Sequence, residues 1–168
     1  MQPNFNTVPE FYRGYIECTN HTPLMGQINE STHQLSLIMD GLNEEKADYR
    51  YLEGKWSLKE MFLHIIDTER IFSYRALCFS RGEMQKLPSF DQDEYVKRSE
   101  ASLRDLESLK REFLSVREST FLMFSSFSEK QWQSKGWVGT LEFTVNILGY
   151  IIVGHLNHHV KIIQSRYI

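Results

Sequence analysis

The sequence has little of what marks several large classes of protein. Its 168 residues include only two cysteines, Cys18 and Cys78, without CxxC spacing, so neither a disulfide framework nor a zinc knuckle is indicated. No apolar run approaches the roughly 18 residues of a membrane span, and the first residues lack the apolar centre of a secretion signal. A net charge of −3 gives no basic surface for nucleic acid. We therefore expect a cytoplasmic protein that binds neither nucleic acid nor a membrane.

The length and composition predict one domain that spans residues 1–168. An apolar content of 41% and a charged content of 24% are ordinary for a globular protein, and 168 residues suffice for one sizeable core. Pro3 and Pro9 lie among several aromatic residues near the N-terminus. Residues 1–21 are therefore expected to form an irregular arm laid over the domain.

Helix-start signals and apolar periodicity predict four long helices. Thr22 and Pro23 resemble an N-cap followed by a first-turn proline, and Ser57 with Glu60 forms a capping box that opens a second helix ending near Ser80. A third helix is predicted to start at Ser99 and to carry an apolar stripe from Leu103 to Phe127, and a fourth to start near Thr144.

The connections between these helices are uneven in length. Residues 81–98 show neither helical nor alternating periodicity and are read as a long loop, which can let the third helix run parallel to the second. Ser128 and Gln131 form another capping box that predicts one short turn, and residues 133–143 are expected to form a loop or a short irregular hairpin. The fold predicted is all-α, a four-helix bundle with a long connection between helices 2 and 3.

Three of the six histidines lie close together near the C-terminus. His155 and His159 are four residues apart, so on a helix both imidazoles point the same way. They share an apolar stripe with Leu148, Ile152 and Ile162, which places them inward, whereas His158 flanks the stripe. Two interpretations stand at this point: hydrogen-bonded core histidines, or two ligands of a metal ion that needs a third.

His64 is the candidate for that third ligand. It lies in the second helix on a polar strip that includes Glu60, Asp67 and Thr68. The strip could face solvent, or it could line a polar cavity inside the bundle. In the second case His64 joins the pair on the fourth helix, and Asp67 or Glu60 could orient it or help with proton transfer.

The segments WSLKEMFLHIIDTERIFSYRALCFSRGE, LPSFDQDEYV and YIIVGHLNHHVKIIQSRY together resemble the DinB-like metalloprotein family, which includes the YfiT-type metal-dependent hydrolases. The resemblance covers nearly the whole chain. It implies a four-helix bundle that binds a divalent metal through a histidine of the second helix and an HxxxH pair of the fourth. Matched residue by residue, these ligands are His64, His155 and His159.

The resemblance implies two reaction classes. Three imidazoles leave coordination positions open, as in catalytic metal sites, which suits either hydrolysis or transfer of a low-molecular-weight thiol of the bacillithiol type in stress or detoxification chemistry. Nickel or zinc is the expected metal, and a homodimer is the expected assembly. Asp67, Glu69, Arg70 and Arg75 are the polar candidates for contact with the substrate. The competing interpretation is a non-catalytic metal-binding or regulatory bundle.

Overall fold

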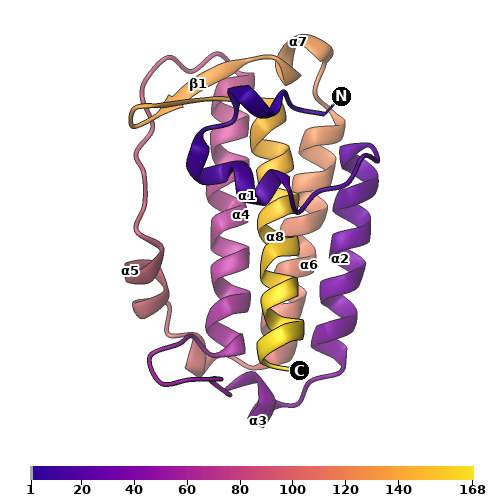
Figure 1. Cartoon of the computed structure of the whole chain (residues 1–168), viewed down its shortest axis with the longest axis vertical. Coiled ribbons are helices and arrows are strands. Elements are labelled where there is room, and N and C mark those ends of the chain that lie inside the picture. The colour runs from indigo at the N-terminus through magenta and orange to yellow at the C-terminus, as the bar shows by residue number, and fades with distance from the viewer. Residues whose placement is uncertain (1) are drawn as a thin grey trace.

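Four long helices dominate the computed structural model, which describes residues 2–168 (Figure 1). They are α2 (Leu24–Asp40), α4 (Leu58–Ser80), α6 (Leu106–Ser125) and α8 (Val145–Arg166). The predicted four-helix bundle is confirmed, and the only strands among the described residues are two of four residues each. Within residues 2–168, no helix has the length and apolar character needed to cross a membrane.

The order of helix directions in the bundle is set by one long connection. In Figure 1, α2 and α8 run down the page, whereas α4 and α6 both run up it. Residues 81–105 therefore return along the outside of the bundle before α6 begins, as the length of this segment predicted. The expectation of a loop without helix over residues 81–98 was wrong in detail, because α5 (Gln92–Lys97) lies within it; a 3-10 turn, η3 (Ala101–Leu103), follows before α6.

Side-chain caps explain where most of the long helices begin. Ser57 and Glu60 form the predicted capping box of α4, and the Thr144 side chain accepts a hydrogen bond from the Ile147 amide at the start of α8. The predicted start of the third helix at Ser99 was wrong. Asp105 caps α6 instead, its carboxylate accepting from the Ser108 amide at 2.6 Å.

Two further details of the helix starts differ from the sequence-based expectation. Thr22 does not cap α2, since Pro23 occupies the N-cap position and makes no side-chain cap bond. Leu103 precedes α6 and is 79% exposed, so it does not belong to the apolar stripe of that helix. In both places a strong local signal lies within a few residues of the true boundary.

Short elements cover both ends of the bundle, the upper and the lower end in Figure 1. The Ser128 capping box opens the predicted single turn, α7 (Glu129–Trp132). The strands β1 (Lys135–Val138) and β2 (Leu141–Thr144) form a regular antiparallel hairpin that turns at Gly139, whose φ of +57° suits glycine. At the lower end, α3 (Glu44–Ala47) forms one turn between α2 and α4.

The apolar core is divided into two clusters by a layer of buried polar residues. One cluster includes Ile28, Phe72, Phe124 and Ile152, and the other includes Leu35, Ile66, Phe113 and Leu156. Between these levels each long helix contributes at least one buried polar side chain. The principal ones are Ser31 on α2, Glu69 on α4, Arg117 on α6 and His155 on α8. We call them, together with His64 and His159, the polar layer.

The N-terminal arm crosses the bundle over α8 (Figure 1). It is less irregular than predicted, because it contains the turns η1 (Phe5–Thr7), η2 (Glu10–Tyr12) and α1 (Arg13–Ile16). The Asn157 side-chain amide donates to the Cys18 carbonyl at 2.9 Å, which ties the end of the arm to α8. Gly154 permits the close approach, since a Cβ there would lie 1.9 Å from the Tyr15 carbonyl oxygen.

Replacing Gly154 by alanine is expected to displace the arm and to lower the free energy of unfolding by about 1–3 kcal/mol, the usual cost of overpacking. Gly26→Ala is the matched control, because Gly26 is an exposed helical position with nothing within 4 Å of an added Cβ. That variant should gain about 0.5–1 kcal/mol from helix propensity. The free energy of unfolding of both variants is measured by urea denaturation, with circular dichroism as the signal. Equal stability of the two variants would contradict the close packing of the arm on α8.

Candidate metal centre

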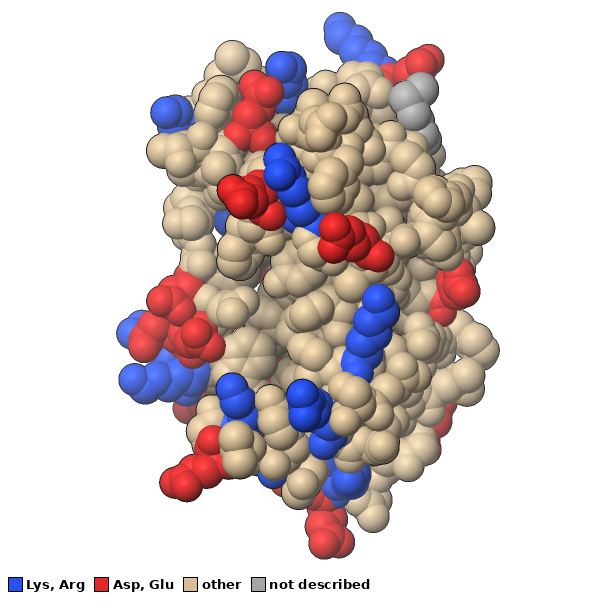
Figure 2. Space-filling model, viewed as in Figure 1, with Lys and Arg blue, Asp and Glu red and all other residues tan. Residues whose placement is uncertain are grey.

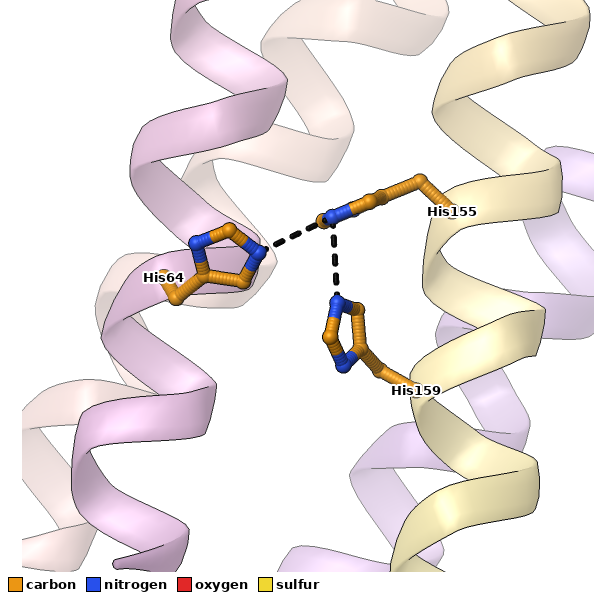
Figure 3. A group of neighbouring side chains, drawn as sticks. All are labelled: His64, His155 and His159. Carbon is orange, nitrogen blue, oxygen red and sulfur yellow. Dashed lines mark hydrogen bonds between the residues drawn. The ribbon is translucent and has the colours of Figure 1, made fainter. Parts of the chain in front are cut away.

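Three histidine side chains meet between α4 and α8 (Figure 3). His64 Nε2 lies 3.0 Å from His155 Nε2, and His159 Nε2 lies 3.1 Å from the same atom. The three side chains are 3%, 4% and 7% exposed, respectively. The polar strip of α4 therefore faces the bundle interior at His64. Of the two interpretations of that strip, the structure shows the polar interior site.

Local sequence explains why the rings converge. The i, i+4 spacing on α8 stacks His155 above His159 on one face, and the apolar residues around them turn that face inward. His158, one position away, is half-buried and its ring lies 5.4 Å from the Tyr15 ring, outside the cluster. This matches the flanking position expected from the helix stripe.

Burial keeps the cluster neutral. It lowers the pKa of His64 to about 4 and is the main cause that holds the pKa of His155 and His159 well below the ordinary value; the neighbouring imidazoles act in the same direction. Neutral imidazoles have a free lone pair, which is the state in which histidine binds a metal.

The donor set fits a shared cation better than a hydrogen-bond network. Nε2 of a neutral imidazole carries either one hydrogen or one lone pair, so His155 Nε2 cannot satisfy both neighbours well. Two nitrogens bound to one zinc ion at about 2.0–2.1 Å would be about 3.0–3.4 Å apart, which matches the separations here. A divalent ion bound at the three Nε2 atoms would satisfy the contacts that protons cannot.

Other residues contact the cluster, and none of them was assigned a role at the site from the sequence. Thr68 Oγ1 lies 3.4 Å from His64 Nδ1, one helical turn along α4. The Trp56 ring lies 4.7 Å from the His64 ring, and the Tyr15 ring 5.3 Å from that of His155. The i+4 spacing from His64 could have identified Thr68. Nothing in the sequence could have identified Tyr15, because it reaches the site through the path of the arm.

A cavity of about 520 Å³ opens beside His155. Figure 2 shows the surface hollowed between the arm and the segment that carries α5, with mostly uncharged atoms around it. Its walls come from the arm, from α4, from the start of the α5 segment and from α8: Phe11, Tyr12, Tyr15, Thr68, Phe72, Arg75, Ser89, Phe90, Asp91, Gln92 and His155. A cavity of this size holds a small organic molecule.

The polar candidates from the sequence are placed in different parts of the molecule. Arg75 lines the cavity. Asp67 and Arg70 lie at the edge of α4, where Arg70 pairs with Glu112 at 2.5 Å and approaches Asp67 at 3.6 Å. Burial raises the pKa of Asp67, although the nearby Arg70 opposes this rise. Neither Asp67 nor Arg70 lines the cavity.

Glu60 and Glu69 are occupied elsewhere, which corrects the roles considered for them. Glu60 accepts from the Ser57 amide at 2.7 Å in the capping box and pairs with Arg50. Glu69 is buried on the other side of α4 and pairs with Arg117 at 2.9 Å. Neither carboxylate is hydrogen-bonded to His64, whose Nδ1 has the Thr68 hydroxyl as its neighbour instead.

The Glu69–Arg117 pair belongs to the half of the polar layer that faces α2. Arg117 is 1% exposed and also donates to the Thr32 and Ser31 hydroxyls and to the Ile28 carbonyl, at 2.7–2.8 Å. Its guanidinium is thus well provided with acceptors. The pair links α2, α4 and α6 across the core and has a structural role.

Comparison with known proteins places the chain in a family. The family model described as the DinB superfamily matches residues 27–163. The chain belongs to the DinB superfamily. This confirms the resemblance seen in the helix motifs. A curated relative from Oceanobacillus iheyensis, "Putative metal-dependent hydrolase OB0413", is 26% identical over 96 residues. The match covers 54% of this chain and 56% of the relative, little more than half of either.

Two solved structures share the fold. YfiT from Bacillus subtilis, described as "a probable metal-dependent hydrolase with an unusual four-helix bundle topology", has a TM-score of 0.73 and 12% identity; the match covers 98% of this chain and 90% of YfiT. A mycothiol-dependent maleylpyruvate isomerase has a TM-score of 0.66 and 12% identity, and the match covers 98% of this chain but only 63% of the isomerase. At these identities the likeness shows a common fold.

Glu69→Ala is expected to lower the free energy of unfolding by about 3–5 kcal/mol, because it leaves the Arg117 charge buried without its counter-ion. Glu142→Ala is the control: its exposed pair with Lys135, at 3.1 Å, should contribute about 0–1 kcal/mol. Chemical denaturation of both variants provides the comparison. A cost for Glu69→Ala as small as that of the control would refute the structural role of the buried pair.

Proposed function

We propose that this protein is a divalent-metal-dependent enzyme that acts on a small molecule bound in the cavity beside His155. The observation that carries the proposal is the convergence of three neutral, buried imidazoles, one of which, His155, lines a cavity large enough for a substrate. Structural zinc sites are usually closed by four protein ligands, whereas catalytic sites keep a position open. Three protein ligands beside a cavity fit the catalytic arrangement.

His64, His155 and His159 would hold the ion, with nickel or zinc the expected identity. A divalent ion there would supply Lewis acidity that lowers the pKa of water or a thiol at its open positions. Thr68 would keep His64 in the required tautomer by accepting a hydrogen from its Nδ1. The arm and the aromatic walls of the cavity would exclude bulk water from the reacting groups.

The nucleophile is expected to come from outside the protein. Neither cysteine lines the cavity, and no histidine outside the cluster does so. An external nucleophile would be water, in a hydrolase, or a low-molecular-weight thiol, in an S-transferase of the bacillithiol type. The names of the relatives support this range: OB0413 and YfiT are described as metal-dependent hydrolases, and the isomerase as mycothiol-dependent. A cytoplasmic location and a homodimeric assembly are part of the proposal.

Elemental analysis of untagged protein tests the metal centre. Wild-type protein incubated with zinc and then dialysed should retain near one equivalent. His64→Ala should lose most of it. We expect its affinity for the metal to fall by more than the roughly 10–100-fold that results when a metal ligand loses its hydrogen-bond partner. His158→Ala is the matched control and should retain the metal, because His158 lies outside the cluster. Full metal content in folded His64→Ala, or its loss in His158→Ala, would contradict the ligand assignment.

Turnover is tested on the zinc- and nickel-loaded protein with two probe reactions. In the first, a thiol displaces bromide from monobromobimane, forming a carbon–sulfur bond and releasing a proton and bromide. In the second, water cleaves p-nitrophenyl acetate. We expect a rate above the spontaneous reaction in one of them, reduced by about 100-fold or more in His64→Ala. Metal-loaded protein that accelerates neither these reactions nor a wider panel of electrophiles, esters and amides would favour a non-catalytic metal-binding protein.

A further inference from the structure

Arg75 is a buried cation without a carboxylate partner among residues 2–168. It is 2% exposed, yet it forms no ion pair with any described aspartate or glutamate. Burial is the main cause that lowers the pKa of its guanidinium, and the neighbours that oppose this effect are the Tyr12 and Tyr95 hydroxyls, not carboxylates. A guanidinium stays charged even so, and a buried charge is costly unless it is paired. Arg117, the other strongly buried arginine, has its glutamate; Arg75 has none.

The protein holds the Arg75 guanidinium in a fixed orientation. Its Nη2 donates to the Pro88 carbonyl at 2.8 Å. The guanidinium also lies over two aromatic rings, 5.3 Å from the centroid of Phe72 and 5.7 Å from that of Phe90. These contacts stabilise the cation but use only one of its five N–H donors. The remaining donors have no hydrogen-bond partner among the described residues, and Arg75 lines the cavity, so they are available to a carboxylate bound there.

Arg75 and the metal centre share one face of α4 and one cavity. His64, Thr68, Phe72 and Arg75 follow one another at steps of four, four and three residues. Their backbones span about 16 Å along the axis, and the side chain of Arg75 leans towards the helix N-terminus, the end that carries His64. Since Arg75 and His155 both line the cavity, one small molecule can reach both.

The charges of the cavity lining select the kind of anion. Its other charged group is Asp91, whose Oδ1 accepts from the Asp93 and Glu94 amides at 3.0 and 3.1 Å as the cap of α5. Arg75 offers one bidentate site, and the Asp91 carboxylate in the same lining repels further negative charge, so this subsite favours a monoanion over a dianionic phosphate. The remaining walls are largely aromatic, which suits an apolar or planar body.

We propose that the substrate carries a carboxylate which binds Arg75, while its apolar body lies against the aromatic walls and its reactive group points to the metal centre. This inference deepens the proposed function and rests on it for the reaction, but the Arg75 subsite binds its ligand on its own. Arg75 is thus a substrate-binding residue that determines specificity for organic acids.

The test compares phenylacetate with phenylacetamide, a pair that differs mainly in charge. Calorimetric titration of the zinc-loaded protein should show the acid binding on the order of ten- to a hundredfold more tightly than the amide. Arg75→Met should bring this ratio near one, and Arg75→Lys should retain part of it. Arg81→Met is the control, because Arg81 lies exposed at the end of the same helix and does not line the cavity.

Repeating the titration without metal separates this inference from the proposed function. A preference for the acid that persists in chelator-treated protein and in His64→Ala, and disappears in Arg75→Met, supports the Arg75 subsite whether or not the metal centre is catalytic. A preference that requires zinc and survives Arg75→Met would show the metal binding the acid, and would overturn the inference. It would also be overturned if inorganic phosphate bound more tightly than phenylacetate, or if neither probe bound at millimolar concentration.

Discussion

The cost of burying polar groups across the middle of a helical bundle constrains this structure more than any other interaction. Each long helix contributes to the polar layer, with Ser31, Glu69, Arg117 and His155 at nearly the same level. Apolar clusters lie on both sides of that level and provide the driving force for folding. The layer is stable only if its members satisfy one another, so the register of all four helices is fixed by this requirement.

The two halves of the layer meet this requirement in different ways. Between α2, α4 and α6, the Arg117 charge is balanced by Glu69, and its donors find several oxygen acceptors. Between α4 and α8, the three histidines become neutral, but His155 Nε2 faces the Nε2 atoms of both His64 and His159, and one nitrogen cannot satisfy both. In the first half the Arg117 guanidinium is satisfied by protein groups, although Glu69 Oε1 is buried without a hydrogen-bond partner among the described residues. The second half gains most from a ligand, and it is also the half that adjoins the cavity.

The sequence predicted the helices and the histidine pair because both depend on local periodicity. Spacing of four residues on an apolar stripe was enough to turn His155 and His159 inward. The direction of His64 could not be derived in that way, since α4 is apolar on more than one side and its polar strip had two possible environments. Only the family resemblance resolved it before the structure did.

Features that depend on tertiary packing were beyond a reading of the sequence. Arginine is usually exposed, so the burial of Arg75 and Arg117 is visible only when the surrounding aromatic and polar groups are in place. Glu69 was a plausible site residue from its position near His64, but the rotation of α4 directs it to the opposite side. The start of α6 was misplaced because Ser99 and Asp105 are both good capping residues, and the packing of the helix decided between them.

The parallel course of α4 and α6 has a consequence for how this protein can diversify. Because the chain must return outside the bundle between these helices, residues 81–105 lie beside the cavity, opposite the arm. The histidines belong to the rigid helices, whereas much of the cavity wall belongs to these two surface segments. Insertions and substitutions in such segments disturb a core little. Changes in these two segments can therefore reshape the cavity wall while the histidine cluster and the helices that carry it stay in place.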